Sequence, residues 1–298
     1  MKVIKNFILY SRLHTVIGTI LSNVALYFIA FSLSDKNEIH FVGFILTLIC
    51  CLGANIYIVG INQIADIEID RINKPYLPLA SGAYTLKTAY IINTISLVIS
   101  VGIAFYYGKY LLVTVLSSLF LGTIYSLPPF RLKRYYFWAA FCIIAVRGLI
   151  VNIFLFLHFH FMLKGFYIIP PTIKLLTAAI FVYSVVIAWF KDIPDMEGDK
   201  QYRISTLSLK MGAKRIFITG NILLLLTMTV LITAVAILQL DINSTWFISL
   251  HILMIMGLIF AASKTHLDKK PSIARYYQFV WGLFFMEYIT FALSTYLR

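Results

Sequence analysis

The chain has 298 residues, of which 61% are hydrophobic and only 12% are charged, and its mean hydropathy is +0.89. A soluble domain of this size does not need so much apolar surface, so the composition excludes soluble classes and predicts an all-α polytopic membrane protein. The net charge of +13 would suit nucleic acid, but the placement of the charges argues against such a partner.

Nine apolar stretches are long enough to cross a bilayer as helices. They lie near residues 13–33, 39–62, 88–107, 110–127, 135–158, 171–191, 216–236, 244–262 and 275–296. The weakest division is the short break at Gly108-Lys109, because merging its two flanks would invert the orientation of everything downstream. No soluble segment interrupts the series, so we expect a single transmembrane domain over residues 1–298.

The loop charges predict the orientation of these spans. With the N-terminus in the cytoplasm, nineteen of the 25 Lys and Arg residues fall on the cytoplasmic side, five on the other, and Arg147 within a span. The N-terminal residues lead directly into the first span, with neither a cleavable signal nor a transit peptide. We therefore expect a bacterial inner membrane (or thylakoid-type) protein whose acidic motifs, described next, face the cytoplasm.

Seven of the twelve acidic residues lie in two short windows, residues 62–75 and 191–199, each at the end of an apolar stretch. If the second span continues as a helix past Asn62, then Asn62, Asp66 and Asp70 recur every four residues and share one face. Carboxylates at a membrane boundary are costly unless they hold a cation or one another. Two such clusters indicate one divalent-metal site built from two halves.

The second window has a similar pattern. Asp192, Asp195 and Asp199 recur at intervals of three and four, so we expect them to share one helical face as well. Pro194 among them predicts a helix start or a kink. Hard oxygen ligands without His or Cys suit Mg²⁺. The alternative is that these are solvated juxtamembrane residues, which would explain any one Asp but explains two matched clusters poorly.

Basic residues surround the same face. They are Arg71, Lys74, Arg131, Lys133, Lys200 and Arg203. Acids, a metal ion and a basic rim together make the composition of a diphosphate site.

Several motifs resemble the UbiA-type intramembrane prenyltransferases. They are Asn-x-x-x-Asp-x-x-x-Asp at residues 62–70 and Asp-x-x-x-Asp at residues 195–199. Three further stretches resemble the homogentisate prenyltransferase branch: Asn-Lys-Pro-Tyr-Leu-Pro-Leu-Ala-Ser-Gly at 73–82, Tyr-Ser-x-Pro-Pro-x-Arg-Leu-Lys at 125–133, and Lys-Asp-x-Pro-Asp-x-x-Gly-Asp at 191–199. The resemblance extends over essentially the whole chain.

The resemblance implies nine helices around a central cavity and a Mg²⁺-dependent transfer of an isoprenyl group from its diphosphate, with phytyl or geranylgeranyl diphosphate as the first expected donor. The acceptor implied is homogentisate, which loses carbon dioxide and gives a prenylquinol of the tocopherol or plastoquinol type. The implied catalytic residues are Asp66, Asp70, Asp195, Asp199 and Tyr125. The implied metal ligands are Asn62, Asp66, Asp70, Asp192, Asp195 and Asp199, and the diphosphate would contact Asn62, Arg71, Lys74, Arg131, Lys133 and Lys191.

Three further residues are candidates for binding the acceptor. Arg12 and His14 belong to Arg-Leu-His-Thr, where the branch usually has Arg-Pro-His-Thr, and by resemblance they would touch the carboxylate of the aromatic acid. Arg147 lies within a span, where a charged residue is a functional candidate, and Asn152 is its polar neighbour about one turn on. Functional and structural interpretations of Arg147 both stay open.

Other functions fit parts of this pattern. The acceptor would instead be another phenolic acid, such as 4-hydroxybenzoate, or a chlorophyllide. A transporter of organic anions would share the loop bias, but it would break its helices near the bilayer centre, whereas these acids lie at one edge. A non-catalytic scaffold gives no reason for two carboxylate sets. The length of the isoprenoid tail and the oligomeric state stay open.

Overall fold

The computed structural model describes residues 2–34, 39–196, 200, 206–238 and 240–298, and every regular element within them is a helix. The helices are α1 (Lys2–Ser11), α2 (Leu13–Ser32), α3 (Phe41–Ala65), α4 (Ile67–Asn73), α5 (Leu86–Tyr107), α6 (Lys109–Ser126), the 3₁₀ helix η1 (Leu132–Arg134), α7 (Tyr136–Ile144), the π-helix η2 (Ala145–Leu155), α8 (Phe156–Lys164), α9 (Pro171–Asp192), α11 (Leu207–Met211), α12 (Ala213–Leu238), α13 (Ser244–Ser263) and α14 (Lys270–Tyr296).

Nine helical spans in the described residues are long and apolar enough to cross a membrane, which confirms the predicted all-α polytopic fold. The fifth span runs from Tyr136 to Lys164 and joins α7, η2 and α8 without a break. α5 and α6 are separate helices because Gly108 between them has a φ of +95°, a conformation that side-chain-bearing residues rarely adopt. The predicted break between two spans at Gly108-Lys109 is therefore confirmed.

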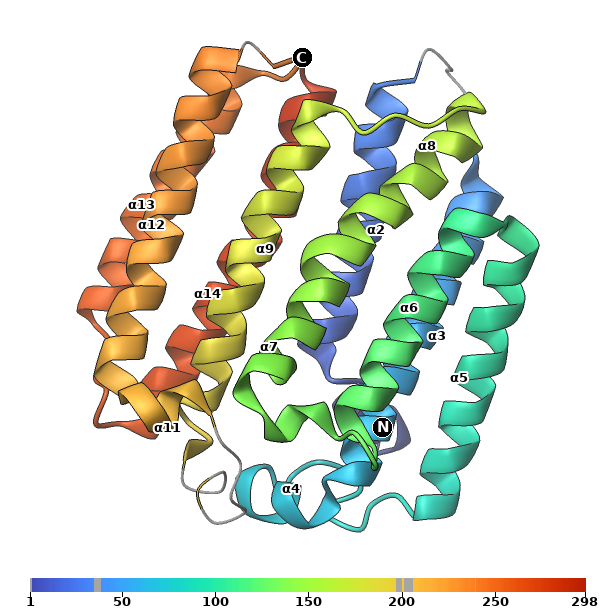
Figure 1. Ribbon diagram of the computed structural model, residues 1–298, viewed down its shortest axis with the longest axis vertical. Helices are drawn as coiled ribbons and strands as arrows, with labels where there is room; N and C mark the ends of the chain where they lie inside the picture. Colours follow the sequence, from blue (N-terminus) through green and yellow to red (C-terminus); the bar gives the residue numbers. More distant parts are fainter. Residues whose placement is uncertain (1, 35–38, 197–199, 201–205, 239) are drawn as a thin grey trace.

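Six of the spans form a closed ring. Going round it, α2 packs on α3, α3 on α6, α6 on η2, η2 on α9, α9 on α14, and α14 on α2. α5 packs outside the ring on α3 and α6, while α12 and α13 pack outside it on α9 and α14. Figure 1 shows these helices as one bundle, with α4, α11 and the N-terminus at one end and the C-terminus at the other.

Glycines bring these helices close together, as small residues do in membrane proteins. A Cβ at Gly60 on α3 would collide with the Asn93 amide of α5 and the Tyr10 hydroxyl of α1. The Tyr10 hydroxyl donates to Asn93 Oδ1 at 2.9 Å, and Gln63 Nε2 donates to the Tyr10 carbonyl at 2.6 Å. Gly60 thus lets α1 and α5 dock on α3 directly before the first acidic window.

We predict that Gly60→Ala destabilises the protein by about 1–3 kcal/mol, because the added methyl group overpacks this buried network. Gly102 on α5 is the matched control, since its Cβ would meet open space. Gly102→Ala should be neutral or stabilising by about 0.5–1 kcal/mol. Thermal unfolding of the purified protein in detergent measures both changes, and equal melting temperatures for the two variants would contradict the prediction.

Candidate active site

The first acidic window lies at a break between two helices. α3 ends at Ala65, Asp66 has φ −117° and ψ 16°, and α4 begins at Ile67. The expectation of one continuous helix past Asn62 is therefore wrong at Asp66, because the backbone leaves helical geometry there. Asn62 and Asp70 still lie side by side, since the Arg12 guanidinium is 3.4 Å from Asn62 Oδ1 and 3.9 Å from Asp70 Oδ2.

The second acidic window follows the end of a span. α9 ends at Asp192, and Ile193 to Asp195 form a turn that contains Pro194. Pro194 therefore stands where a helix stops, and no single helical face carries both Asp192 and Asp195 as the spacing had suggested. Asp199 lies outside the described residues.

An ion pair between described residues joins the two windows. Lys74 Nζ lies 2.6 Å from Asp195 Oδ2, and the two residues are 121 positions apart in the chain. Lys74 directly follows α4 and Asp195 follows α9, so both windows lie at the same end of the bundle. This contact confirms the expectation that the two stretches converge.

Asp66 is enclosed by two cations from the loop after α6. Lys133 Nζ lies 2.5 Å from Asp66 Oδ1, and an Arg131 nitrogen lies 3.3 Å from the same oxygen. The Lys133 side chain is only 8% exposed, and its burial lowers the pKa of the amine to about 8 although Asp66 opposes the shift. This loop therefore holds a concentrated positive charge against the first window.

The backbone is strained where cations reach the first window. Arg12 and Arg131 have φ values of 52° and 39°, and they are the two non-glycine residues with positive φ in the part of the chain that the structure describes. Such a conformation costs roughly 1–3 kcal/mol and collects at functional sites. Both residues contact the first window, Arg12 through Asn62 and Asp70, and Arg131 through Asp66.

The end of α6 lies between the windows. Tyr125 OH accepts a hydrogen bond from Lys191 Nζ at 2.9 Å, and the neighbouring Ser126 accepts one from Asn62 Nδ2 at 3.3 Å. Lys191 also lies 3.9 Å from Asp192 Oδ1. Tyr125 and Lys191, both implied by the resemblance, are thus brought together with the window residues.

Two other predicted basic residues, Arg71 and Lys200, do not join the site in the part of the chain that the structure describes. Arg71 pairs with Glu68 at 2.9 Å, and the two side chains are 57% and 68% exposed, so both point away from the remaining site residues. Lys200 is exposed, and Arg203 lies outside the described residues. The predicted diphosphate role of Arg71 gains no support from this geometry.

The carboxylates suit a divalent cation held jointly with a phosphate. Asp70 is buried, one of its oxygens has no hydrogen-bond partner, and burial raises the pKa of its carboxyl above the ordinary value. Within the described residues no three His, Cys, Asp or Glu side chains gather as a metal cluster. Magnesium does not need one, because it is usually held by one or two carboxylates together with substrate phosphates and water.

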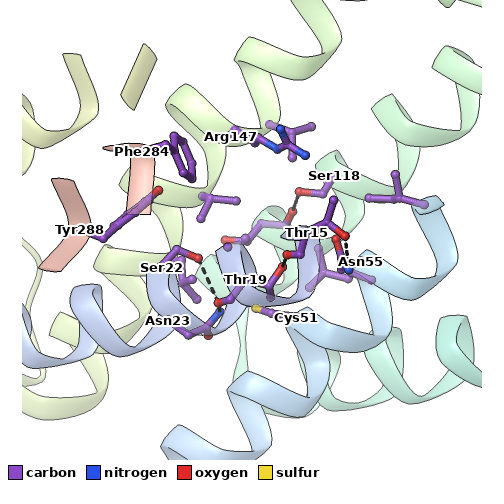
Figure 2. A pocket seen from close by; sticks show the side chains of 18 of the residues that line it. Thr15, Thr19, Ser22, Asn23, Cys51, Asn55, Ser118, Arg147, Phe284 and Tyr288 are labelled. Carbon is purple, nitrogen blue, oxygen red and sulfur yellow. Dashed lines mark hydrogen bonds between the residues drawn. The ribbon is translucent and has the colours of Figure 1, made fainter. Parts of the chain in front are cut away.

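A cavity inside the ring adjoins this site. It is lined by α2, α3, α6, η2 and α14, and Figure 2 shows Thr15, Asn55, Ser118 and Arg147 around it. Asn55 and Asn62 lie on the same face of α3, about two turns apart, which places the cavity directly deeper in the bundle than the first window.

Arg147 is the cation of this cavity. Its guanidinium carbon lies 4.5 Å from the centre of the Trp281 ring, and the His14 ring lies 5.1 Å from the same ring. No acidic side chain pairs with Arg147 among the described residues. Arg147 thus lines the cavity and His14 packs against the same Trp281 ring, whereas Arg12 lies beside the first window.

Sequence reasoning missed the partners that hold these residues. Trp281 packs against both Arg147 and His14, Ser126 accepts from Asn62, and Tyr288 of α14 lines the same cavity. Trp281 and Tyr288 are about two turns apart on α14, but the sequence does not indicate which face of the last span meets Arg147.

Comparison with known proteins decides the family. The UbiA prenyltransferase family matches residues 23–284. The chain belongs to the UbiA prenyltransferase family. It is therefore a prenyltransferase, as the resemblance implied, and the transporter alternative is not supported.

Two relatives and one solved structure are similar over nearly the whole chain. Homogentisate phytyltransferase of Synechocystis is 43% identical over 100% of this chain and 97% of its own length. Homogentisate phytyltransferase 1 of Arabidopsis thaliana is 40% identical over 95% of this chain and 73% of its own. A UbiA homolog from Archaeoglobus fulgidus bound to GPP and Mg²⁺ superposes with a TM-score of 0.65 at 15% identity, covering 98% of this chain and 100% of that one, and so shares the fold.

Removal of one carboxylate should abolish metal-dependent anion binding. Mg²⁺ with inorganic pyrophosphate should raise the melting temperature of the unaltered protein, because a ligand that binds only the folded state stabilises it. Asp66→Asn should remove this rise. Glu68→Gln is the matched control in the same window, and it should keep the rise because Glu68 points to solvent. A full rise in Asp66→Asn would contradict the assignment.

Proposed function

We propose that this protein transfers a phytyl group from phytyl diphosphate to homogentisate, with Mg²⁺ as its cation and with loss of carbon dioxide from the acceptor. Both similar relatives carry this activity in their names and align over most of the chain. The observation that carries the proposal is the Lys74–Asp195 ion pair. It brings the two acidic windows together next to a cavity whose arginine, Arg147, has no acidic partner among the described side chains.

The donor diphosphate binds between the windows. Lys74, Arg131 and Lys133 now pair with Asp195 and Asp66, and they can turn to the phosphate oxygens once a metal ion takes over the carboxylates. Arg12 joins this set, since its guanidinium reaches the first window. The same side chains then hold the leaving pyrophosphate after the allylic C–O bond breaks.

Two sets of oxygen ligands would hold the metal ions. Asn62, Asp66 and Asp70 form one set, and Asp192, Asp195 and Asp199 form the other. When bound, Mg²⁺ supplies positive charge that stabilises the departing diphosphate. Lys191 and Tyr125 lie between the two sets and are placed to orient the diphosphate.

The acceptor occupies the central cavity. Arg147 supplies a cation for the acceptor's carboxylate, and a carboxylate there would pair with an arginine that has no acidic partner among the described side chains. His14 lies beside the same Trp281 ring and is placed to contact the same acid. The apolar part of the cavity, which includes Val115, Leu155 and Phe284, keeps water from the allylic cation.

The site faces the cytoplasm of a bacterial cell or the equivalent side of a thylakoid-type membrane, as a single domain in lipid. The Lys and Arg bias of the loops supports this orientation. The synthesis of tocopherol or a related prenylquinol is the process that such a product serves.

Loss of either window should abolish transfer. We expect Asp66→Ala and Asp195→Ala to lower the turnover number at least a thousandfold, because each removes charge stabilisation of the leaving group. Excess EDTA should abolish activity, and added Mg²⁺ should restore it. Glu68→Gln should retain activity. Mass analysis of the lipid extract after incubation with homogentisate and phytyl diphosphate measures the product.

The same assay separates the acceptors. Purified protein receives homogentisate, 4-hydroxybenzoate or a chlorophyllide, each with phytyl, geranylgeranyl or solanesyl diphosphate. Product with homogentisate supports the proposal. Product with another phenol alone would overturn the acceptor, and activity that survives chelation in washed membranes would overturn the metal mechanism.

A further inference from the structure

The backbone that carries Arg147 is unusual. Arg147 lies in η2, an eleven-residue π-helix from Ala145 to Leu155 in the middle of the fifth span. π-Helical turns are rare, and they appear mostly as short insertions at functional sites. At Gly148 an added Cβ would lie 3.0 Å from the Cα of Phe181, so η2 packs closely against α9 at this position.

Asn152 holds this segment from within. Its Nδ2 donates to the Arg147 carbonyl at 2.8 Å and to the Gly148 carbonyl at 3.2 Å. The Asn152 side chain is fully buried and does not line the cavity. Its amide therefore acts on the backbone of Arg147, five residues earlier, rather than on anything bound in the cavity.

Tyr288 fixes the orientation of that amide. The Tyr288 hydroxyl donates to Asn152 Oδ1 at 2.8 Å, which leaves the Asn152 NH₂ directed at the two carbonyls. Tyr288 is on α14, about two turns after Trp281 on the same face, and Trp281 packs against the Arg147 guanidinium. Helix α14 thus acts on Arg147 in two ways. Tyr288 orients Asn152, which bonds the Arg147 backbone, and Trp281 packs against the Arg147 side chain.

We propose that Asn152 and Tyr288 are positioning residues that aim Arg147 at the carboxylate of the acceptor and so determine acceptor affinity. This inference rests on the proposed function, in which Arg147 binds that carboxylate. Neither residue contacts the acidic windows, so the donor site is independent of the pair. Loss of either residue should therefore raise the Michaelis constant for the acceptor and leave the Michaelis constant for the donor unchanged.

The test uses the full-length protein in detergent or vesicles. Tyr288→Phe and Asn152→Leu should each raise the KM for homogentisate about tenfold, since each removes a buried hydrogen bond from one network, and should leave the KM for phytyl diphosphate unchanged. The double variant should be no worse than the single ones, because Tyr288 acts through Asn152. Additive increases in this KM would mean that Tyr288 contacts the acceptor itself, and they would overturn the proposal that Tyr288 acts through Asn152.

A neutral acceptor analogue shows whether a variant misplaces the Arg147 charge or disturbs the whole acceptor site. The methyl ester of homogentisate lacks the carboxylate charge, so its inhibition constant should be the same in the unaltered protein and in both variants. Tyr183→Phe is the matched control, because Tyr183 is equally buried on α9 but does not line the cavity. It should leave both Michaelis constants unchanged. Thermal unfolding of each variant checks that the protein is folded.

The variant Arg147→Gln separates a failure of the proposed acceptor site from a failure of the positioning inference. If Arg147→Gln leaves the KM for homogentisate unchanged, the proposed role of Arg147 itself is wrong. If Arg147→Gln raises that KM while Tyr288→Phe and Asn152→Leu do not, Arg147 binds the acceptor and the positioning inference is overturned.

Discussion

Carboxylates pair with lysine and arginine at one end of the bundle, and these pairs hold the two acidic windows beside each other. A buried or half-buried acid in an apolar protein needs a cation, and here Lys74, Arg131 and Lys133 supply it to Asp195 and Asp66. Because Lys74 and Asp195 come from opposite halves of the chain, their pairing brings the two halves together at one end of the bundle. A divalent cation would take the place of these side-chain cations at the carboxylates, and a diphosphate would take the place of the carboxylates at Lys74, Arg131 and Lys133.

The ring of helices then separates two kinds of chemistry by depth. The windows and their cations lie at one end of the bundle, and Arg147 lies deeper, with Trp281 on one side and the hydroxyl groups of α2 and α6 on the other. Under the proposed function, an anionic leaving group beside the windows and an anionic acceptor within the cavity would be held by different cations. The aromatic and aliphatic wall between them is the place where a carbon–carbon bond can form away from water.

The sequence predicts the spans and the convergence of the two windows, and each wrong prediction has a local physical cause. Span lengths depend on hydropathy alone, so all nine spans were predicted, and Gly108 marked the division that hydropathy left weak. Periodicity placed Asn62 and Asp70 together but assumed a continuous helix, whereas the backbone breaks at Asp66. The contacts of Arg147 with Trp281, and of Asn152 with Tyr288, depend on how α14 is rotated against η2. Such rotation is set by packing across the whole ring, which no single span encodes.

A double-mutant cycle on donor binding can decide whether the two acidic windows form one shared site. The affinity of a non-reactive phytyl thiodiphosphate would be measured with Mg²⁺ in the unaltered protein, in Asp66→Asn, in Asp195→Asn and in the double variant. If the windows share one site, each single change should remove most of the Mg²⁺-dependent affinity, and the double change should lower the affinity little further. Independent, additive losses, or full affinity after loss of either window, would contradict it.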